Sequence, residues 1–279
     1  MTGSGTGAAQ VADYGMFGPN SVTWRIMTEP VMWVAGLRAL YLQALHPRVM
    51  QGTWQNSAFA RSGEAWGRFT RTIRFVEIRT YGTLAEVERA GRRLRRIHAS
   101  LTGVDDDGRE FRLDEPELLL WVHCAEVSSA ADVARRSGIR INRDDLDAFV
   151  AEQRRSASVV GLDPSTVPGS MSELDAYYRQ MRPRLRACPE ARLALRLSFT
   201  PRLPLPLLPL RFVVPPLNVL AFTSLPGWAR QLYGAPASLV TDAAATVALR
   251  AAYEATSRIP PQLLFVPGAM RARRAMRAA

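Results

Sequence analysis

The sequence predicts an all-α protein, built as a single bundle of many helices. Apolar residues recur every three to four positions in several long segments, which is typical of helices with one buried face. No segment alternates apolar and polar residues over a useful strand length, and no strand–helix–strand rhythm appears. The 279 residues, 47% of them hydrophobic, are enough for one large core.

The N-terminal segment is small and polar, and we expect residues 1–14 to be flexible. It has neither the basic nor the apolar region of a signal peptide, which predicts a cytoplasmic protein that is not secreted. The two cysteines, Cys124 and Cys188, form no CxxC pair, which excludes a zinc ribbon and agrees with a reducing compartment.

Local start and stop signals divide the first half of the chain. Gly15–Ser21 has the composition of a turn, and Ser21 is a suitable N-cap for a helix that begins at Val22. His46 precedes a proline and therefore ends or kinks the preceding helix, while Pro47 can open the next one. The following helices are predicted over residues 30–45, 47–55, 64–81 and 83–101.

The helix over 83–101 has the clearest period. Its apolar residues fall on one stripe, which we expect to be buried: Leu84, Val87, Leu94, Ile97 and Leu101. Most of its arginines fall outside that stripe: Arg89, Arg92, Arg93 and Arg96.

The second half of the chain begins with a loop at Gly103–Gly108. Asp114 is the predicted cap of a helix that carries His123, and Asn142 or Asp144 starts the next helix, which runs to about residue 160. Further helices are predicted over 172–181, with Ser172 as cap, and over the alanine-rich residues 237–256.

Residues 201–226 are as apolar as a membrane span but contain seven prolines, too many for one spanning helix. We expect an extended apolar crossing followed by a short helix over 216–224, packed on the core or touching a membrane surface. The last ten residues hold four arginines and suggest a basic helical tail, either solvated or on a membrane surface.

The chain is basic, with 36 lysines and arginines against 25 acidic residues. Such a charge suits an anionic cofactor or an anionic membrane, or it reflects a genome that favours arginine codons. No helix-turn-helix pattern or aromatic platform supports nucleic-acid binding. The phosphate loops and nucleophile motifs of the common enzyme classes are absent.

Three histidines are the candidate metal ligands. His98 shares the apolar stripe with Leu94, where it is either a core histidine bonded to a backbone carbonyl or an axial ligand of haem iron. Arg95 and Arg96 lie beside it in sequence and could meet haem propionates. The alternatives are His123, three residues before a glutamate, and His46; two histidines and a carboxylate would suit non-haem iron.

Arg68, Arg71 and Thr72 are spaced to share one helix face. Two guanidiniums and a hydroxyl on one face suit an anion, a propionate or bound oxygen. The alternative is a solvated charged face.

The order of several short motifs resembles the MpaB-type oxygenase family, which includes the latex-clearing rubber oxygenases. The motifs span residues 15 to about 275: Gly15–Trp24, Leu37–Pro47, Trp66–Arg68, Arg71–Thr72, Tyr81–Gly82, Ile97–His98 with Gly103, Asp114–His123, Val167–Pro168, Met181–Leu185, Leu225–Pro226 and Leu232–Gly234.

The resemblance implies one helical domain over 15–279 around a b-type haem, with a histidine as proximal iron ligand. His98 best matches that histidine, with His123 and His46 as alternatives. Arg68, Arg71 and Thr72 match the family's Arg-x-x-Lys-Thr motif, with arginine in place of lysine. Members that cleave polymers are secreted and have extra helices, so a small apolar or unsaturated substrate is expected here, with dioxygen as co-substrate. A haem- or lipid-binding protein without turnover is the alternative.

Overall fold

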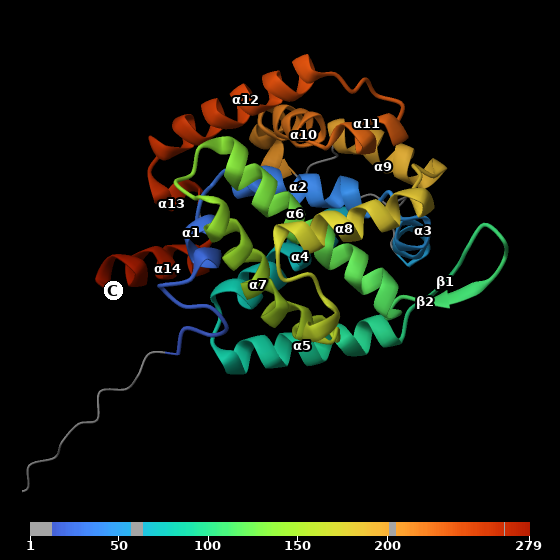
Figure 1. The fold of residues 1–279 in the computed structure, drawn as a ribbon, viewed down its shortest axis with the longest axis horizontal. Helices are drawn as coiled ribbons and strands as arrows, with labels where there is room; N and C mark the ends of the chain where they lie inside the picture. The colour runs from blue at the N-terminus through green and yellow to red at the C-terminus, as the bar shows by residue number, and fades with distance from the viewer. Residues whose placement is uncertain (1–12, 57–63, 201–204, 265) are drawn as a thin grey trace, which may run out of the picture.

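The computed structural model describes residues 13–56, 64–200, 205–264 and 266–279, and it confirms the all-α fold. Helices dominate the described residues, and the only strands among them form one short antiparallel hairpin (Figure 1). The α-helices are α1 (Val22–Met27), α2 (Met32–Gln43), α3 (Pro47–Gln55), α4 (Glu64–Tyr81), α5 (Leu84–Ala99), α6 (Pro116–Ser137), α7 (Arg143–Val160), α8 (Met171–Met181), α9 (Pro189–Phe199), α10 (Val214–Thr223), α11 (Gly227–Leu232), α12 (Leu239–Ser257), α13 (Pro261–Leu264) and α14 (Pro267–Ala278). The hairpin strands are β1 (Thr102–Val104) and β2 (Glu110–Arg112), and 3₁₀ helices cover Pro164–Thr166, Arg182–Arg184 and Leu205–Phe212.

Capping residues set several helix starts as predicted. The Ser21 hydroxyl oxygen accepts a hydrogen bond from the Trp24 backbone N–H at 3.1 Å, so α1 begins at Val22. His46 is extended, and α3 begins at Pro47. Asn142 caps α7 and forms a reciprocal capping box with Asp145.

Two predicted caps are wrong. The residue that precedes α6 is Glu115, because the Asp114 carboxylate is turned to Arg112, 2.6 Å away, at the end of the hairpin. The cap of α8 lies two residues earlier than expected, because the Ser170 hydroxyl rather than that of Ser172 accepts a hydrogen bond from the backbone N–H of Glu173.

Helix α6 forms the centre of the core. Its residues Trp121, Cys124 and Val133 are fully buried, and the helix packs against α2, α7 and α12. In Figure 1, α12 lies above α6 and α5 lies below it. Both cysteines are free and buried, as ordinary core thiols are.

Helix α5 lies below this core and packs on α7. A Cβ atom at Gly91 would lie 2.9 Å from Cγ1 of Val159, so the two helices meet at this glycine. The predicted burial of the apolar stripe is wrong in part, because Leu84 is 52% exposed and Ile97 is 44% exposed. Leu84 and Ile97, near the two ends of α5, are therefore not part of the core.

The proline-rich segment differs from the expected crossing. Residues 201–204 lie outside the described part, and Leu205–Phe212 form a 3₁₀ helix rather than the expected extended crossing. The expected short helix is present as α10. Phe212 and Val213, where the 3₁₀ helix meets α10, are 70% and 57% exposed.

Both ends of the described chain contact the body. The Asp13 carboxylate accepts a hydrogen bond from Leu84 N at 3.1 Å, while residues 1–12 of the expected flexible segment lie outside the described part. The basic tail is α14, which packs on α4 and α1, and Gly268 N donates to Glu77 at 2.7 Å. None of the helices in the described ranges combines the length and apolar character required to span a bilayer.

Candidate functional site

A cavity of about 1270 Å³ lies between α2, α3, α4, α5, α6 and α9. Most of its wall is apolar, formed by side chains that include Leu37, Leu40, Val49, Phe75, Ile78, Leu94, Ile97, Leu101, Leu118, Leu119, Val122 and Leu195. A few charged and polar groups interrupt this surface, the arrangement that is usual for small-molecule and cofactor sites. We refer to it as the cavity.

Five of the residues singled out in the sequence line the cavity together. Arg68, Arg71 and Thr72 come from α4, His98 from α5 and His123 from α6. Burial, and secondarily the charge of Arg71, lowers the pKa of Arg68. The Thr72 hydroxyl donates to the Arg68 carbonyl at 3.1 Å, which leaves its oxygen available as an acceptor.

His98 stands on the α5 wall of the cavity. Burial lowers the pKa of His98, the charge of Arg68 acts in the same direction, and Asp114 opposes both. Within the described ranges, its buried Nδ1 has no hydrogen-bond partner. The alternative of a core histidine bonded to a backbone carbonyl therefore finds no support.

His123 is more deeply placed, with 4% of its surface exposed. Burial lowers the pKa of His123 to about 4, with Arg79 adding to the effect and Glu126 opposing it. The Glu126 carboxylate pairs with Arg79 at 2.8 Å, and both line the cavity. Glu126 is thus engaged by a guanidinium rather than by the imidazole three residues before it.

His46 lies outside the cavity. Its Nε2 is 3.6 Å from Oε1 of Glu117, and its ring centroid is 6.3 Å from that of Trp121. Burial lowers the pKa of His46, while Glu117 opposes the shift. His46 is the extended N-cap residue of α3 but makes no side-chain capping bond, and its buried Nδ1 also lacks a partner among the described residues.

Arg95 and Arg96 do not join the cavity either. Arg95 donates to the Val159 carbonyl at 2.7 Å, and Arg96 is exposed and donates to the Arg92 carbonyl at 3.4 Å. Arg95 lies one turn before His98, and its bond to Val159 directs its guanidinium toward α7. The contact of Arg95 and Arg96 with a haem held by His98 stays a prediction, and neither arginine lines the cavity.

Two other arginines of α5 do line the cavity, Arg89 and Arg93. Spacing by four residues places them on one helix face with Ile97, a signal that was present in the sequence. A polar cluster at the opposite wall had no such signal, because α2, α9 and α10 each supply one member. There the Tyr41 hydroxyl donates to Asn218 Oδ1 at 2.6 Å and lies 2.8 Å from the Ser198 hydroxyl.

The described side chains contain no group of three or more histidines, cysteines, aspartates or glutamates placed to hold a metal ion. A family model described as "ER-bound oxygenase mpaB/B'/Rubber oxygenase, catalytic domain" matches residues 24–258, a range that includes the whole cavity lining. No curated protein and no solved structure matches the chain.

Proposed function

Since the chain belongs to the family of MpaB and rubber oxygenase catalytic domains, we propose that it is a haem b-dependent oxygenase acting on a small apolar or unsaturated substrate. The observation that carries this proposal is the cavity, where imidazoles with lowered pKa stand in an apolar chamber beside several arginines. The family supplies the oxygenase activity; the cofactor, the substrate class and the residue roles are our inference.

The residues of the cavity suit haem. An imidazole must be neutral to hold iron, and the lowered pKa values of His98 and His123 keep both neutral at pH 7. Haem iron needs only one or two protein ligands, so no larger cluster is required. Arg89 and Arg93 supply the guanidiniums that would meet the propionates.

We assign the iron ligand to His98, because among the described histidines it is the one that both lines the cavity and has a buried ring nitrogen without a partner. Haem, when bound, supplies the redox chemistry of dioxygen, which no side chain of the cavity provides. Arg68 and Arg71 place positive charge on the α4 side, where they attract developing negative charge. The Arg79–Glu126 pair fixes the α4–α6 contact beside His123.

The apolar wall decides which substrates enter. Side chains such as Phe75, Leu94 and Leu195 offer dispersion contacts and exclude water, and they do not pair with a strongly polar substrate. A compact hydrocarbon or unsaturated lipid fits these walls.

A non-haem iron oxygenase is less well supported. It uses two histidines and a carboxylate on one metal, and Glu126 is already paired with Arg79. A haem- or lipid-binding protein without turnover would use the same cavity, and oxygen uptake that depends on an added unsaturated lipid separates it from the oxygenase.

The first test is a visible spectrum with a pyridine haemochrome assay on the purified protein, reconstituted with haem where necessary. We expect a Soret band that is lost in His98→Ala and kept in His46→Ala, because only the first residue lines the cavity. A band lost only in His123→Ala moves the ligand to α6. No band in the reconstituted wild-type protein would overturn the haem proposal.

A further inference from the structure

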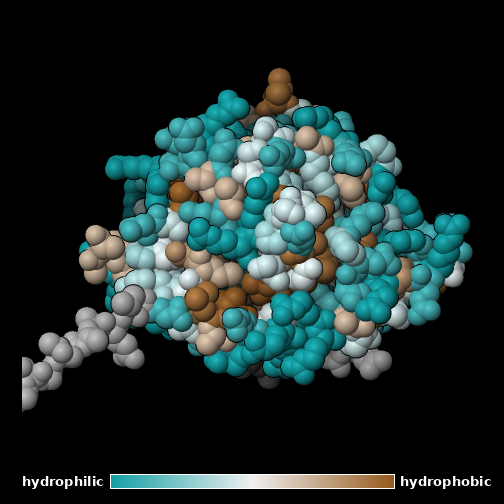
Figure 2. Space-filling model, turned by 60° about the horizontal axis from the view of Figure 1, so that its bottom comes forward, coloured by the Kyte–Doolittle hydropathy of each residue, from teal (hydrophilic) through white to brown (hydrophobic). Residues whose placement is uncertain are grey.

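A second pocket lies on the other side of α5, between this helix, α7 and the turn at Gly15–Met16. Its volume is about 860 Å³. We call it the arginine pocket, because four of the residues that line it are arginines. Its charged lining residues are Arg92, Arg95, Arg154, Arg155 and Glu88. Figure 2 turns the α5 side of the molecule forward and shows brown apolar surface in a recess bordered by teal hydrophilic residues.

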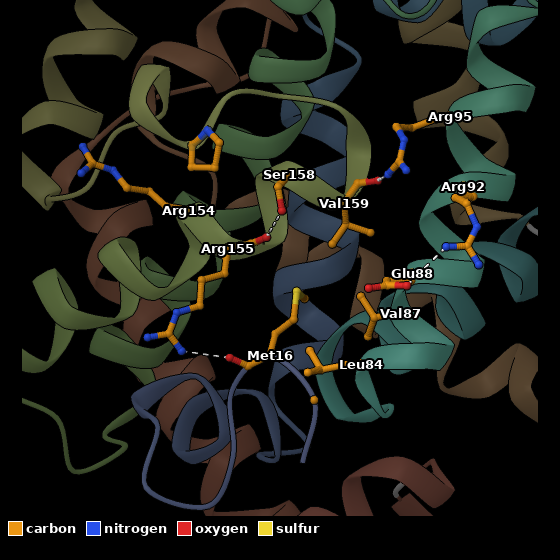
Figure 3. A pocket seen from close by; sticks show the side chains of 12 residues that line it. Met16, Leu84, Val87, Glu88, Arg92, Arg95, Arg154, Arg155, Ser158 and Val159 are labelled. Atoms are coloured by element: carbon orange, nitrogen blue, oxygen red, sulfur yellow. Dashed lines mark hydrogen bonds and ion pairs between the residues drawn. The ribbon is translucent and has the colours of Figure 1, made fainter. Parts of the chain in front are cut away.

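The floor of the arginine pocket is apolar. In Figure 3, the side chains of Met16, Leu84, Val87 and Val159 lie between Arg92 and Arg95 on one side and Arg155 on the other. Leu84 is 52% exposed, whereas Val87 and Val159 are buried, so the accessible apolar surface of the pocket is mainly that of Leu84 and the half-buried Met16. An apolar floor with a cationic rim suits a molecule that is apolar at one end and anionic at the other.

Arg95 is built into this pocket. Its guanidinium donates to the Val159 carbonyl at 2.7 Å, and its side chain passes close to Gly91 and Gly161. A Cβ atom at Gly91 would lie 3.1 Å from Nη1 of Arg95, and one at Gly161 would lie 3.2 Å from its Cδ. Both glycines therefore leave room for the arginine side chain, which is held in place without a carboxylate.

The charge of Arg95 is not balanced by an ion pair among the described residues. A guanidinium has five N–H donors, and the Val159 bond uses one of them. Arg155 across the pocket donates to the Met16 carbonyl at 2.9 Å, which is likewise neutral. Arg92 has an exposed i,i+4 pair with Glu88 at 3.3 Å, a weak interaction.

We propose that the arginine pocket binds an amphiphilic anion, with Arg95 holding the anionic group and the apolar floor covering the alkyl part. Carboxylate and phosphate both match the guanidinium fork, so the shared chemistry is an anionic head on a short alkyl chain. The site is separate from the cavity and does not rest on haem binding.

Calorimetric titration of the full-length protein with octanoate and with octyl phosphate tests the proposal. We expect at least one of them to bind, Arg95→Gln to raise its Kd at least tenfold, and Arg96→Gln to change it less than twofold. Arg96 is the matched control because it lies on the same helix outside both pockets. Octanol and inorganic phosphate, which each lack one half of the ligand, are expected to bind at least tenfold more weakly.

Four results would overturn the proposal: no binding of either amphiphile, equal binding by Arg95→Gln, equal binding of octanol, or equal binding of inorganic phosphate. If Arg95→Gln does not fold, the wild-type protein still decides the question by phenylglyoxal labelling and peptide mass spectrometry. Protection of Arg95 by the bound amphiphile, with Arg96 unprotected, supports the site, and equal labelling of Arg95 with and without ligand contradicts it. We also expect Arg95→Gln to keep the Soret band of the haem-loaded wild-type protein. Loss of amphiphile binding with the Soret band unchanged shows that the two proposals are tested separately.

Discussion

Burial of the His123 ring makes the stability of the protein depend on pH. The pKa of His123 is about 4 in the folded protein and about 6.5 in an unfolded chain. Between these values the unfolded chain binds a proton that the folded protein does not, so stability falls as the pH falls. The contribution is complete above pH 6.5 and decreases toward pH 4, by at most about 3 kcal/mol.

Urea unfolding of the haem-free protein at pH 7.5 and pH 5 measures this effect. The wild-type protein should lose stability at pH 5, and His123→Asn should lose less, because the titrating ring is gone. His46 and His98 keep a smaller slope in the variant, since burial lowers their pKa values too. An identical pH slope in both proteins would contradict the assignment.

The buried, charged side chain of Arg38 gives a second prediction, for the free energy of unfolding. It is 3% exposed, donates to the Ser129 hydroxyl at 2.9 Å and lies 3.3 Å from the Asp132 carboxylate. Arg38→Ala should cost about 3 kcal/mol in urea unfolding, because the partners lose their donor and a void remains. The exposed Arg250→Ala on α12 should cost less than about 0.5 kcal/mol, and a similar cost for both would refute the prediction.

At the scale of the helix, cap and proline signals located the starts of three helices correctly, whereas the caps expected at Asp114 and Ser172 were misplaced. Ser21, Pro47 and Asn142 fixed the starts of α1, α3 and α7 because each satisfies or removes orphan N–H groups locally. Helix α9 was missed although Pro189 stands at its start, as Pro47 does in α3. The hairpin was missed because each strand has three residues and one buried position, too few for an alternating pattern.

The contact of α5 with α7 depends on a glycine. Gly91→Val would place side-chain atoms against Val159, push α5 away, and cost about 1–3 kcal/mol from overpacking. Because α5 forms one wall of the cavity, we also expect weaker haem retention. Gly36→Ala on α2 is the control, since nothing lies within 4 Å of its added Cβ, and it should stabilise by about 0.5–1 kcal/mol. Equal unfolding midpoints for Gly91→Val and wild type would disprove the tight contact.

At the scale of the molecule, the site is assembled from helices far apart in sequence. The sequence predicted that Arg68, Arg71 and Thr72 share a face, because that spacing is local. It did not predict that the Arg95 side chain points away from the cavity, because its hydrogen-bond partner, the Val159 carbonyl, belongs to another helix. The polar cluster at Tyr41 was equally out of reach, since its partners come from α9 and α10.

Contact with a membrane surface is a property of the whole molecule and stays a prediction. Phe212 and Val213 are exposed, and the Arg211 guanidinium carbon stands 4.7 Å from the Phe212 ring centroid. We expect flotation with vesicles of anionic lipids at low salt, weaker flotation as salt rises, and loss in Phe212→Glu with Val213→Glu. Val104→Glu, at an exposed apolar position on the hairpin, should float like the wild type. Failure of the wild-type protein to float with anionic vesicles at low salt would contradict the predicted membrane contact.

Helix α5 forms a partition with a chamber on either face, since Arg93 and His98 line one and Arg92 and Arg95 line the other. Occupants of two chambers that share a wall are thermodynamically linked whenever either one prefers a particular position of that wall. Linkage is reciprocal, so if both proposed ligands bind, the factor by which octanoate changes the affinity for haem must equal the factor by which haem changes the affinity for octanoate. Two titrations run in opposite order on one preparation would therefore measure the coupling free energy between the two sites.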